Sequence, residues 1–198
     1  MGQTPSPSSQ KGFLIAEVLL RTFGLAATMV GTALMATDNQ TIQFFGIEME
    51  AKYSYATALK FYVAANSAAS FVSLLSLFAL IYYVRLDKSC HCQKKFYTIF
   101  LLDLTVVVCV VSGSSAASTI AYMGKYGNSH AGWMPICDHF GKWCNKVLAS
   151  LLSSYAAAFL YLVLTIWSAW KAAVISNNSE NNLMIRDNKV GTELVSEI

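Results

Sequence analysis

Hydrophobic residues along this chain gather in four long runs, at about 13–36, 61–84, 96–123 and 147–174. Each run exceeds the roughly 20 residues that a helix needs to cross the hydrocarbon core of a bilayer. Because backbone groups in lipid must satisfy their hydrogen bonds internally, such segments are helices. The pattern predicts an all-α membrane protein, a four-transmembrane-helix bundle over 13–174. A disordered N-terminal tail (1–12) and a flexible C-terminal tail (175–198) flank it.

The composition supports a membrane protein over a soluble one. Hydrophobic residues make up 55% of the chain and charged residues 13%, whereas a soluble domain is about 45–50% apolar and about 25% charged. The first run could resemble a signal peptide, but it is longer than the usual apolar region of about 7–15 residues and contains Glu17 and Arg21. We therefore expect it to be a retained span.

The charges between the runs predict how the bundle is oriented. The N-terminus, the middle loop and the C-terminus hold eight Lys and Arg, four of them within 85–95, and the first and third loops hold five. Positive residues favour the cytoplasm, so both termini are expected there. The first loop then faces outward with its sequon at Asn39, a candidate glycosylation site. The sequon that begins at Asn177 would be cytoplasmic and unmodified.

Two cysteines lie in the third loop, in the stretch ICDHFGKWC, where Cys137 and Cys144 are seven positions apart. Outside the cell, paired cysteines are usually oxidised. A zinc site would need four ligands, and Cys137, His139 and Cys144 supply at most three. The predicted topology therefore favours a disulfide over free thiols or a metal site, and no metal or cofactor is expected.

The other cysteines have different surroundings. Cys90 and Cys92 follow the second run on the predicted cytoplasmic side. Cysteines in such a position are candidates for palmitoylation, and two reduced thiols are the alternative. Cys109 lies in the middle of the third run, where a packing role is expected.

Two opposite charges lie at matching depths within the runs. From the predicted cytoplasmic ends, Arg21 is about 12 Å and Asp103 about 10–11 Å into its helix. A charge within a span usually faces the bundle interior and has a partner, so the two are expected to pair. Glu17, one helical turn before Arg21, either completes a Glu–Arg–Asp cluster or faces lipid headgroups. The alternative is an ion or proton relay, which is disfavoured because no second level of polar residues is expected to continue it.

Catalytic and nucleic-acid-binding functions find no support in the sequence. It contains neither a Gly-rich phosphate loop nor His and carboxylate residues at catalytic spacing. The net charge of +3 is spread over the predicted cytoplasmic segments. We therefore expect neither an enzyme nor a nucleic-acid partner.

Several stretches carry a resemblance to a known family. They are YVAAN at 62–66, FLLDL at 100–104 and GNSHAGWMPIC at 127–137, followed by Phe140 and Cys144. With these stretches the chain resembles the plant Casparian strip membrane protein-like family, which is similar to the MARVEL tetraspan proteins. The resemblance covers most of the chain between about 11 and 173.

The resemblance implies both a set of residues and a function. The family's Arg in the first span and Asp in the third correspond to Arg21 and Asp103, and its paired outer cysteines to Cys137 and Cys144. Founding members are scaffolds of the root endodermis that restrict lateral diffusion and recruit lignin-polymerising enzymes. The first loop, with FFG at 44–46, is more similar to the broader "-like" members.

The expected function is therefore a multi-pass plasma-membrane scaffold that contacts lipid, forms homo- and heterodimers or larger assemblies with family members, and organises a membrane domain. The resemblance also implies cell-wall-modifying enzymes as partners. The alternative is a small channel or transporter subunit that uses Arg21 and Asp103.

Overall fold

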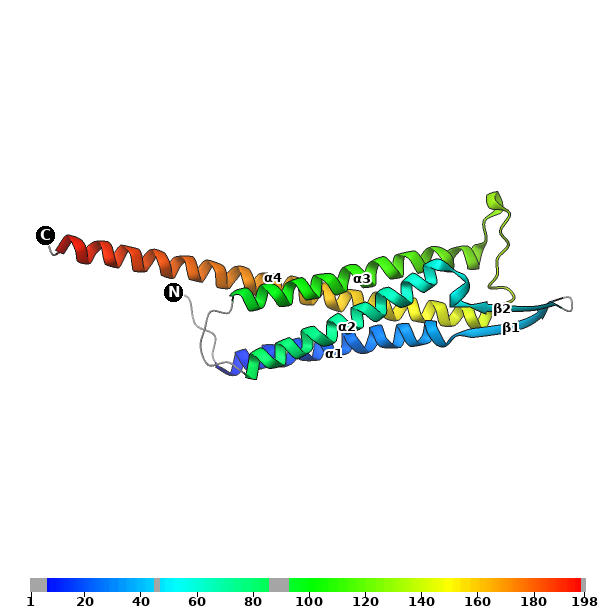
Figure 1. Cartoon of the computed structure of the whole chain (residues 1–198), viewed down its shortest axis with the longest axis horizontal. Helices are drawn as coiled ribbons and strands as arrows, with labels where there is room; N and C mark the ends of the chain where they lie inside the picture. The colour runs from blue at the N-terminus through cyan, green and yellow to red at the C-terminus, as the bar shows by residue number, and fades with distance from the viewer. Residues whose placement is uncertain (1–6, 45–46, 86–92, 197–198) are drawn as a thin grey trace.

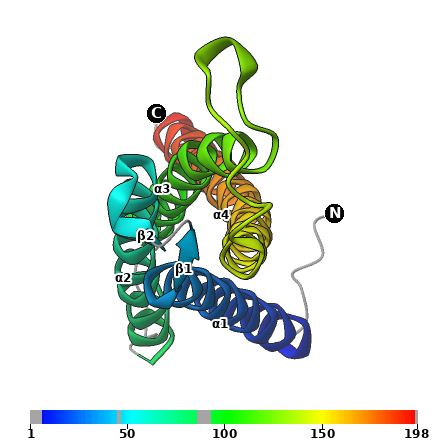
Figure 2. The ribbon, with the colours of Figure 1, turned by 90° about the vertical axis from the view of Figure 1, so that its right-hand side faces the viewer.

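The computed structural model describes residues 7–44, 47–85 and 93–196. Its four long helices run alternately in opposite directions (Figure 1): α1 (Pro7–Thr37), α2 (Thr57–Arg85), α3 (Gln93–Tyr126) and α4 (Gly141–Ser196). Seen along the bundle, they follow one another around it, and α1 closes the ring against α4 (Figure 2). One end of the bundle carries a β-hairpin and is called the hairpin end. The other, where α1 begins and α4 leaves the bundle, is called the tail end.

Each helix contains a stretch that is long and apolar enough to cross a membrane. These stretches are Ile15–Thr37, Thr57–Tyr82, Tyr97–Tyr126 and Gly141–Lys171. They confirm the predicted class, a membrane protein built on a four-helix bundle. The fourth stretch begins six residues earlier than predicted, because the helix already starts at Gly141, inside the disulfide-bonded segment.

The helices bury many polar side chains beside an apolar core, and they expose large apolar side chains. On α2, Ser76 is fully buried while Phe78 is 65% exposed, and Ser73 is buried while Phe71 is 63% exposed. A soluble bundle would have the opposite arrangement. In lipid, large apolar side chains are stable on the surface, and hydroxyl groups are satisfied by facing another helix.

A two-stranded antiparallel hairpin projects from the bundle between α1 and α2 (Figure 1). Strand β1 (Asn39–Phe44) pairs with β2 (Ile47–Lys52), and a short 3₁₀ turn, η1 (Tyr53–Tyr55), leads into α2. The sequence prediction treated this region only as a loop. Tyr55 donates a hydrogen bond to Glu50 at 3.0 Å, and this bond together with the carboxylate charge raises the pKa of Tyr55 above its ordinary value.

The two tails differ from the sequence prediction. Helix α4 continues through Ser196 and extends well beyond the bundle (Figure 1), where a flexible tail over 175–198 was expected. The physical reason is that no proline interrupts this segment after the span ends. Helix α1 begins at Pro7, inside the tail expected to be disordered; proline is well suited to the first helical position. Residues 1–6 lie outside the described ranges.

Candidate functional site

Arg21 of α1 and Asp103 of α3 meet inside the bundle, near the tail end. The two guanidinium nitrogens of Arg21 donate separately to the two carboxylate oxygens of Asp103, Nη1 to Oδ1 at 2.5 Å and Nη2 to Oδ2 at 2.6 Å. Arg21 is 1% exposed and Asp103 is fully buried. This paired arrangement is the strong form of an Arg–carboxylate contact, because both donors and both acceptors are used.

The charge cluster also contains Glu17 and Lys171. Nη2 of Arg21 contacts Oε1 of Glu17 at 3.3 Å, and Nζ of Lys171 donates to Oε2 of Glu17 at 2.7 Å. Glu17 is buried, so it completes the cluster rather than facing headgroups. Two carboxylates and two cations meet here, and their formal charges balance within the bundle.

Two serines, one on α2 and one on α4, also form hydrogen bonds to this cluster. Ser76 of α2 accepts a hydrogen bond from Arg21 and donates to Oδ1 of Asp103 at 3.2 Å. Ser168 of α4 lies 3.5 Å from Oδ2 of Asp103. All four helices therefore contribute to one buried network. Removal of a single charged member would leave its partner uncompensated in a region of low dielectric constant, which is the costly state.

Polar side chains continue from the charge cluster toward the hairpin end, contrary to the sequence prediction. Ser73 of α2 shares a hydrogen bond with Tyr161 of α4, and one turn further Ser70 donates to Thr28 of α1 at 3.1 Å. The prediction was wrong because isolated Ser, Thr and Tyr residues stand out little in an apolar run. On α2, however, Ser70, Ser73 and Ser76 are three residues apart, so they lie on one face of the helix in successive turns.

A further polar level surrounds Tyr62 and Asn66 of α2. The Tyr62 hydroxyl bonds with Ser150 Oγ at 2.8 Å, and Ser154 donates to Asn66 Oδ1 at 3.2 Å. Ser150 also donates to the carbonyl oxygen of Gly31 at 2.6 Å. Beyond this level, an apolar cluster fills the hairpin end of the bundle. Its buried members include Met35, Leu59, Phe140, Trp143, Val147 and Leu151. The polar column is therefore closed by apolar packing on that side.

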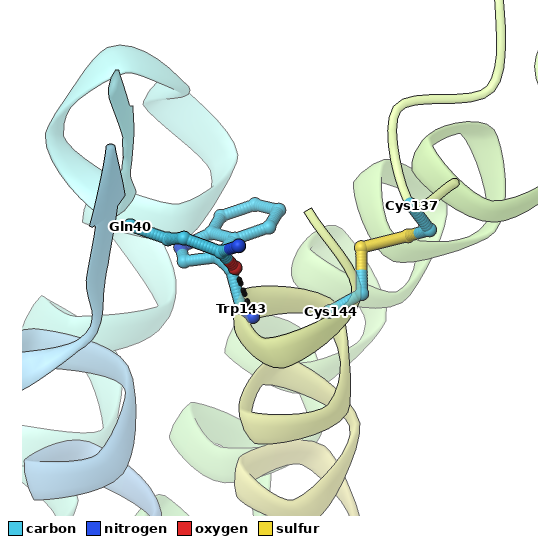
Figure 3. The surroundings of a disulfide bond; sticks show 4 residues. All are labelled: Gln40, Cys137, Trp143 and Cys144. Atoms are coloured by element: carbon cyan, nitrogen blue, oxygen red, sulfur yellow. Dashed lines mark hydrogen bonds between the residues drawn. A yellow bond between two sulfur atoms is a disulfide. The ribbon is translucent and has the colours of Figure 1, made fainter. Parts of the chain in front are cut away.

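The disulfide lies at the hairpin end, apart from the charge cluster. Cys137 in the α3–α4 connection is bonded to Cys144 in the first turn of α4, with 5.7 Å between their Cα atoms (Figure 3). In the same turn, the backbone N–H of Trp143 donates to the side-chain oxygen of Gln40 at 2.9 Å (Figure 3). The first turn of α4 is thus tied to the connection on one side and to strand β1 on the other.

The remaining predicted residues fall at separate places. Asn39 is exposed at the start of β1, two residues after the last residue of α1. Cys109 is a free, partly buried cysteine of α3. Cys90 and Cys92 lie outside the described residues. Within the described ranges, no group of three His, Cys, Asp or Glu side chains is placed to share a metal ion.

Sequence reasoning missed Lys171, Ser76 and Ser168 as members of the charge cluster. Lys171 was a candidate interface anchor at the end of the fourth run, and Ser76 was one serine among several. A depth comparison could have found Ser76, because it is eight residues from the predicted tail-side end of its run, as Arg21 is from the start of its own. Lys171 is the last residue of the fourth apolar stretch, well before the end of α4, and lies at the level of Glu17.

Comparison with known proteins gives a consistent result. Residues 10–160 match the profile of the Casparian strip membrane protein domain. The chain is 42% identical over 173 residues to CASP-like protein 1F1 of Vitis vinifera, covering 87% of this chain and 82% of that relative. It is 41% identical to CASP-like protein 1F1 of Ricinus communis, covering 84% and 92%. It is 36% identical to CASP-like protein 1F2 of Ricinus communis, covering 96% and 92%. No solved structure matches the chain.

Proposed function

Because the chain belongs to the Casparian strip membrane protein family, we propose that this multi-pass membrane protein is a non-catalytic scaffold that self-associates and organises a domain of the plasma membrane. The observation that carries the proposal is the internal neutralisation of the charge cluster. Glu17, Arg21, Asp103 and Lys171 balance one another and join helices. They hold a compact bundle whose outer surface is free to contact lipid and neighbouring proteins.

The proposed orientation places the tail end in the cytoplasm and the hairpin end outside the cell. The distribution of Lys and Arg supports this orientation. The disulfide at the hairpin end supports it independently, because disulfides persist in oxidising compartments. The hairpin and the α3–α4 connection would then lie on the outer side of the membrane.

We propose homo- and hetero-association with family members as the route to assembly, with cell-wall-modifying enzymes as recruited partners. Large apolar side chains on the outside of every span support lateral contacts in the membrane. They include Phe23, Phe71, Val108 and Phe159. Close packing between such surfaces, rather than burial from water, drives association in lipid.

The experiment is to follow a fluorescently tagged full-length chain in plant cells. A scaffold is expected to give clusters at the plasma membrane that recover slowly after photobleaching, together with co-purification of a differently tagged second copy. A tagged four-span plasma-membrane protein of another family serves as the control for crowding. Uniform distribution with recovery as fast as that control, and no co-purification, would overturn the proposal.

A second candidate function is a small channel or transporter subunit, and the polar column favours it. Hydroxyl pairs such as Ser73–Tyr161 and Ser70–Thr28 continue from Asp103 toward the middle of the bundle. The apolar cluster at the hairpin end opposes it, because the column stops there. Ion or proton flux in liposomes that hold the purified chain, above that of empty liposomes, would favour transport. Absence of flux above that of empty liposomes would favour the scaffold.

A further inference from the structure

The α3–α4 connection, residues 127–140, presents apolar side chains on its outer surface. Met134 is 85% exposed, Trp133 57% and Ile136 48%. The connection projects sideways from the bundle, away from the neighbouring helices (Figure 2). An exposed group of large apolar side chains on a well-formed loop marks a contact surface.

Backbone and side-chain hydrogen bonds fix the shape of this loop. The Asn128 side chain accepts from the N–H groups of His130 and Ala131, at 3.1 and 3.3 Å, and caps the 3₁₀ turn η2 (Ser129–Ala131). The N–H of Asn128 donates to the carbonyl oxygen of Trp133 at 2.9 Å. Gly127 has φ +68°, and a Cβ there would lie 2.6 Å from that same oxygen. The fold of the loop therefore displays Trp133 in a defined position.

Hydrogen bonds to α3 set the depth of the loop relative to the membrane span. The N–H groups of Ile136 and Cys137 both donate to the carbonyl oxygen of Gly124, at 2.8 and 3.0 Å. Gly124 lies in the last turn of the apolar stretch that ends at Tyr126. The loop thus folds back to the level where the span meets the bilayer surface and does not extend far into water.

The exposed side chains continue the lipid-facing surface of α3. Tyr122 and Tyr126 are 66% and 63% exposed, with ring centroids 4.9 Å apart, and Lys125 lies over the Tyr126 ring at 5.4 Å. Tyrosine, tryptophan and a nearby lysine are the residues that favour the boundary between headgroups and acyl chains. From Asn128 to Ile136, the loop carries no Lys, Arg, Asp or Glu.

We propose that loop 127–140 is an interfacial anchor that rests on the protein's own bilayer, with Trp133, Met134 and Ile136 entering the boundary between headgroups and acyl chains. The loop then widens the protein's contact with one leaflet beside α3. Burial of these side chains in the interface removes apolar surface from water, which stabilises this position of the loop. The disulfide and the bonds to Gly124 hold the loop at that level.

A hollow of about 200 Å³ beside the loop supports contact with lipid. It lies between the end of α3 and the start of α4, and its lining includes Ala121, Val147 and Leu148, with Lys125 and Asn145 among the polar residues. An apolar hollow with a cationic group among its lining residues at this depth suits an acyl chain below its headgroup. Lipid that fills it lies next to the anchored loop.

Tryptophan fluorescence of the full-length chain in nanodiscs, one copy per disc, tests the proposal. The difference between the parent and Trp133→Phe isolates the emission of Trp133. We expect this emission to be strongly reduced when the phospholipids carry bromine near the top of their acyl chains, and to be insensitive to iodide in the water. A matched reference is Met49→Trp in the Trp133→Phe background, because Met49 is 48% exposed on the hairpin at the same end.

The emission of the tryptophan at position 49 is the standard with which the quenching of Trp133 is compared. The hairpin extends along the bundle away from the helices (Figure 1), so a tryptophan at position 49 is expected to be quenched by iodide and spared by bromine. If Trp133 behaves in the same way, its side chain faces water, the anchor is overturned, and the loop is instead a surface for a soluble or membrane protein partner. Bromine quenching of Trp133 alone supports the anchor. Trp133→Phe keeps an aromatic ring, and a melting temperature equal to that of the parent confirms that it folds.

Discussion

Asp103 has no access to solvent, and its carboxylate contacts side chains from the three other helices. We predict that Asp103→Asn or Arg21→Leu alone destabilises the bundle by roughly 3–5 kcal/mol, because each leaves one uncompensated charge in the buried cluster. The double change to Leu at both positions is expected to cost much less than the sum of the two single changes. Surface abundance in cells and thermal unfolding in detergent measure the effect.

Asp138→Asn is the matched control for these variants, because it makes the same chemical change at an exposed carboxylate outside the spans. It is expected to leave abundance unchanged. Costs that simply add, without recovery in the double variant, would mean that Arg21 and Asp103 do not depend on each other. An unpartnered Asp103 would then favour the transport alternative.

The disulfide between Cys137 and Cys144 restrains only the α3–α4 connection and the first turn of α4. We predict that Cys137→Ser removes about 2–3 kcal/mol of restraint on the unfolded segment and makes residues 127–140 more sensitive to protease. The four spans still insert, because insertion depends on apolar length. The peptides joined by the bond are identified by mass spectrometry without reduction.

Cys109→Ser is the control for loss of a thiol, since Cys109 is free and lies within α3. It is expected to leave the protease pattern unchanged. Alkylation of both Cys137 and Cys144 in the intact, unreduced protein would contradict the bond itself.

At the residue scale, depth along a span was the informative quantity. Arg21 and Asp103 lie at equal depth and have opposite charges, and this was enough to predict that they pair, without knowledge of which helices are neighbours. Lys171, Ser76 and Ser168 were not identified in this way, so half of the six-residue network was missed. Hydroxyl pairs such as Ser73–Tyr161 are harder to predict, because a hydroxyl in a span can bond to its own backbone, as Thr22 does with the carbonyl of Val18 at 2.8 Å.

At the scale of elements, the four helices follow from apolar length, but the hairpin and the extent of α4 do not. Strand β1, with the sequence NQTIQF, contains little apolar surface, and its pairing with β2 depends on contacts at the bundle end, where Ile42 and Ala51 pack. The bond from Trp143 to Gln40 joins residues 103 positions apart. Contacts at such separation are set by how the helices pack and are not visible in local patterns.

Close approach of α1 to α2 and α4 gives an element-scale prediction. A Cβ at Gly31 would lie 2.8 Å from Ser154 Oγ, 3.0 Å from the Tyr62 hydroxyl and 3.1 Å from a backbone oxygen of Ser150. Gly31→Ala is therefore expected to force the helices apart and to cost about 1–3 kcal/mol, the usual range for overpacking. Thermal unfolding of the purified chain measures the loss.

Gly12→Ala is the control within the same helix, because a Cβ there meets nothing within 4 Å. It is expected to be neutral or to stabilise by up to about 1 kcal/mol, since alanine is the better helix former. Equal effects of the two substitutions would show that helix propensity, not helix–helix contact, determines the outcome at Gly31.

At the scale of the whole molecule, many polar groups are buried beside an apolar core and large apolar groups face the surroundings, and this exposure of apolar groups follows from the solvent. The four apolar runs, together with 55% hydrophobic and 13% charged residues, predicted a membrane protein. The order of the helices around the bundle was not predicted, because each apolar run can pack against any other. The buried network restricts how the helices pack, because the charge cluster forms only when side chains from all four helices lie at the same depth.

The orientation of the whole molecule gives the last prediction. The start of α1 and the end of α4 lie on the same side of the bundle (Figure 1), so a measurement at either chain terminus fixes the side of the membrane. We expect a tag before Met1 or after Ile198 to be cytoplasmic, because the tail end and the middle loop carry most of the Lys and Arg. A tag inserted at Gly132 is expected to be outside, and a Cβ at that position meets nothing within 4 Å.

Antibody labelling of the tags in intact and permeabilised protoplasts measures this directly. The disulfide provides an independent check, because orientation and oxidation are linked: Cys137 and Cys144 stay oxidised only if the hairpin end faces an oxidising compartment. The two sequons add a third check, since Asn39 and Asn177 lie toward opposite ends of the bundle, and glycosylation of Asn177 would mean that the tail end is outside. Labelling of the terminal tags on intact cells, with free thiols at Cys137 and Cys144, would reverse the orientation and place the interfacial loop in the cytoplasmic leaflet.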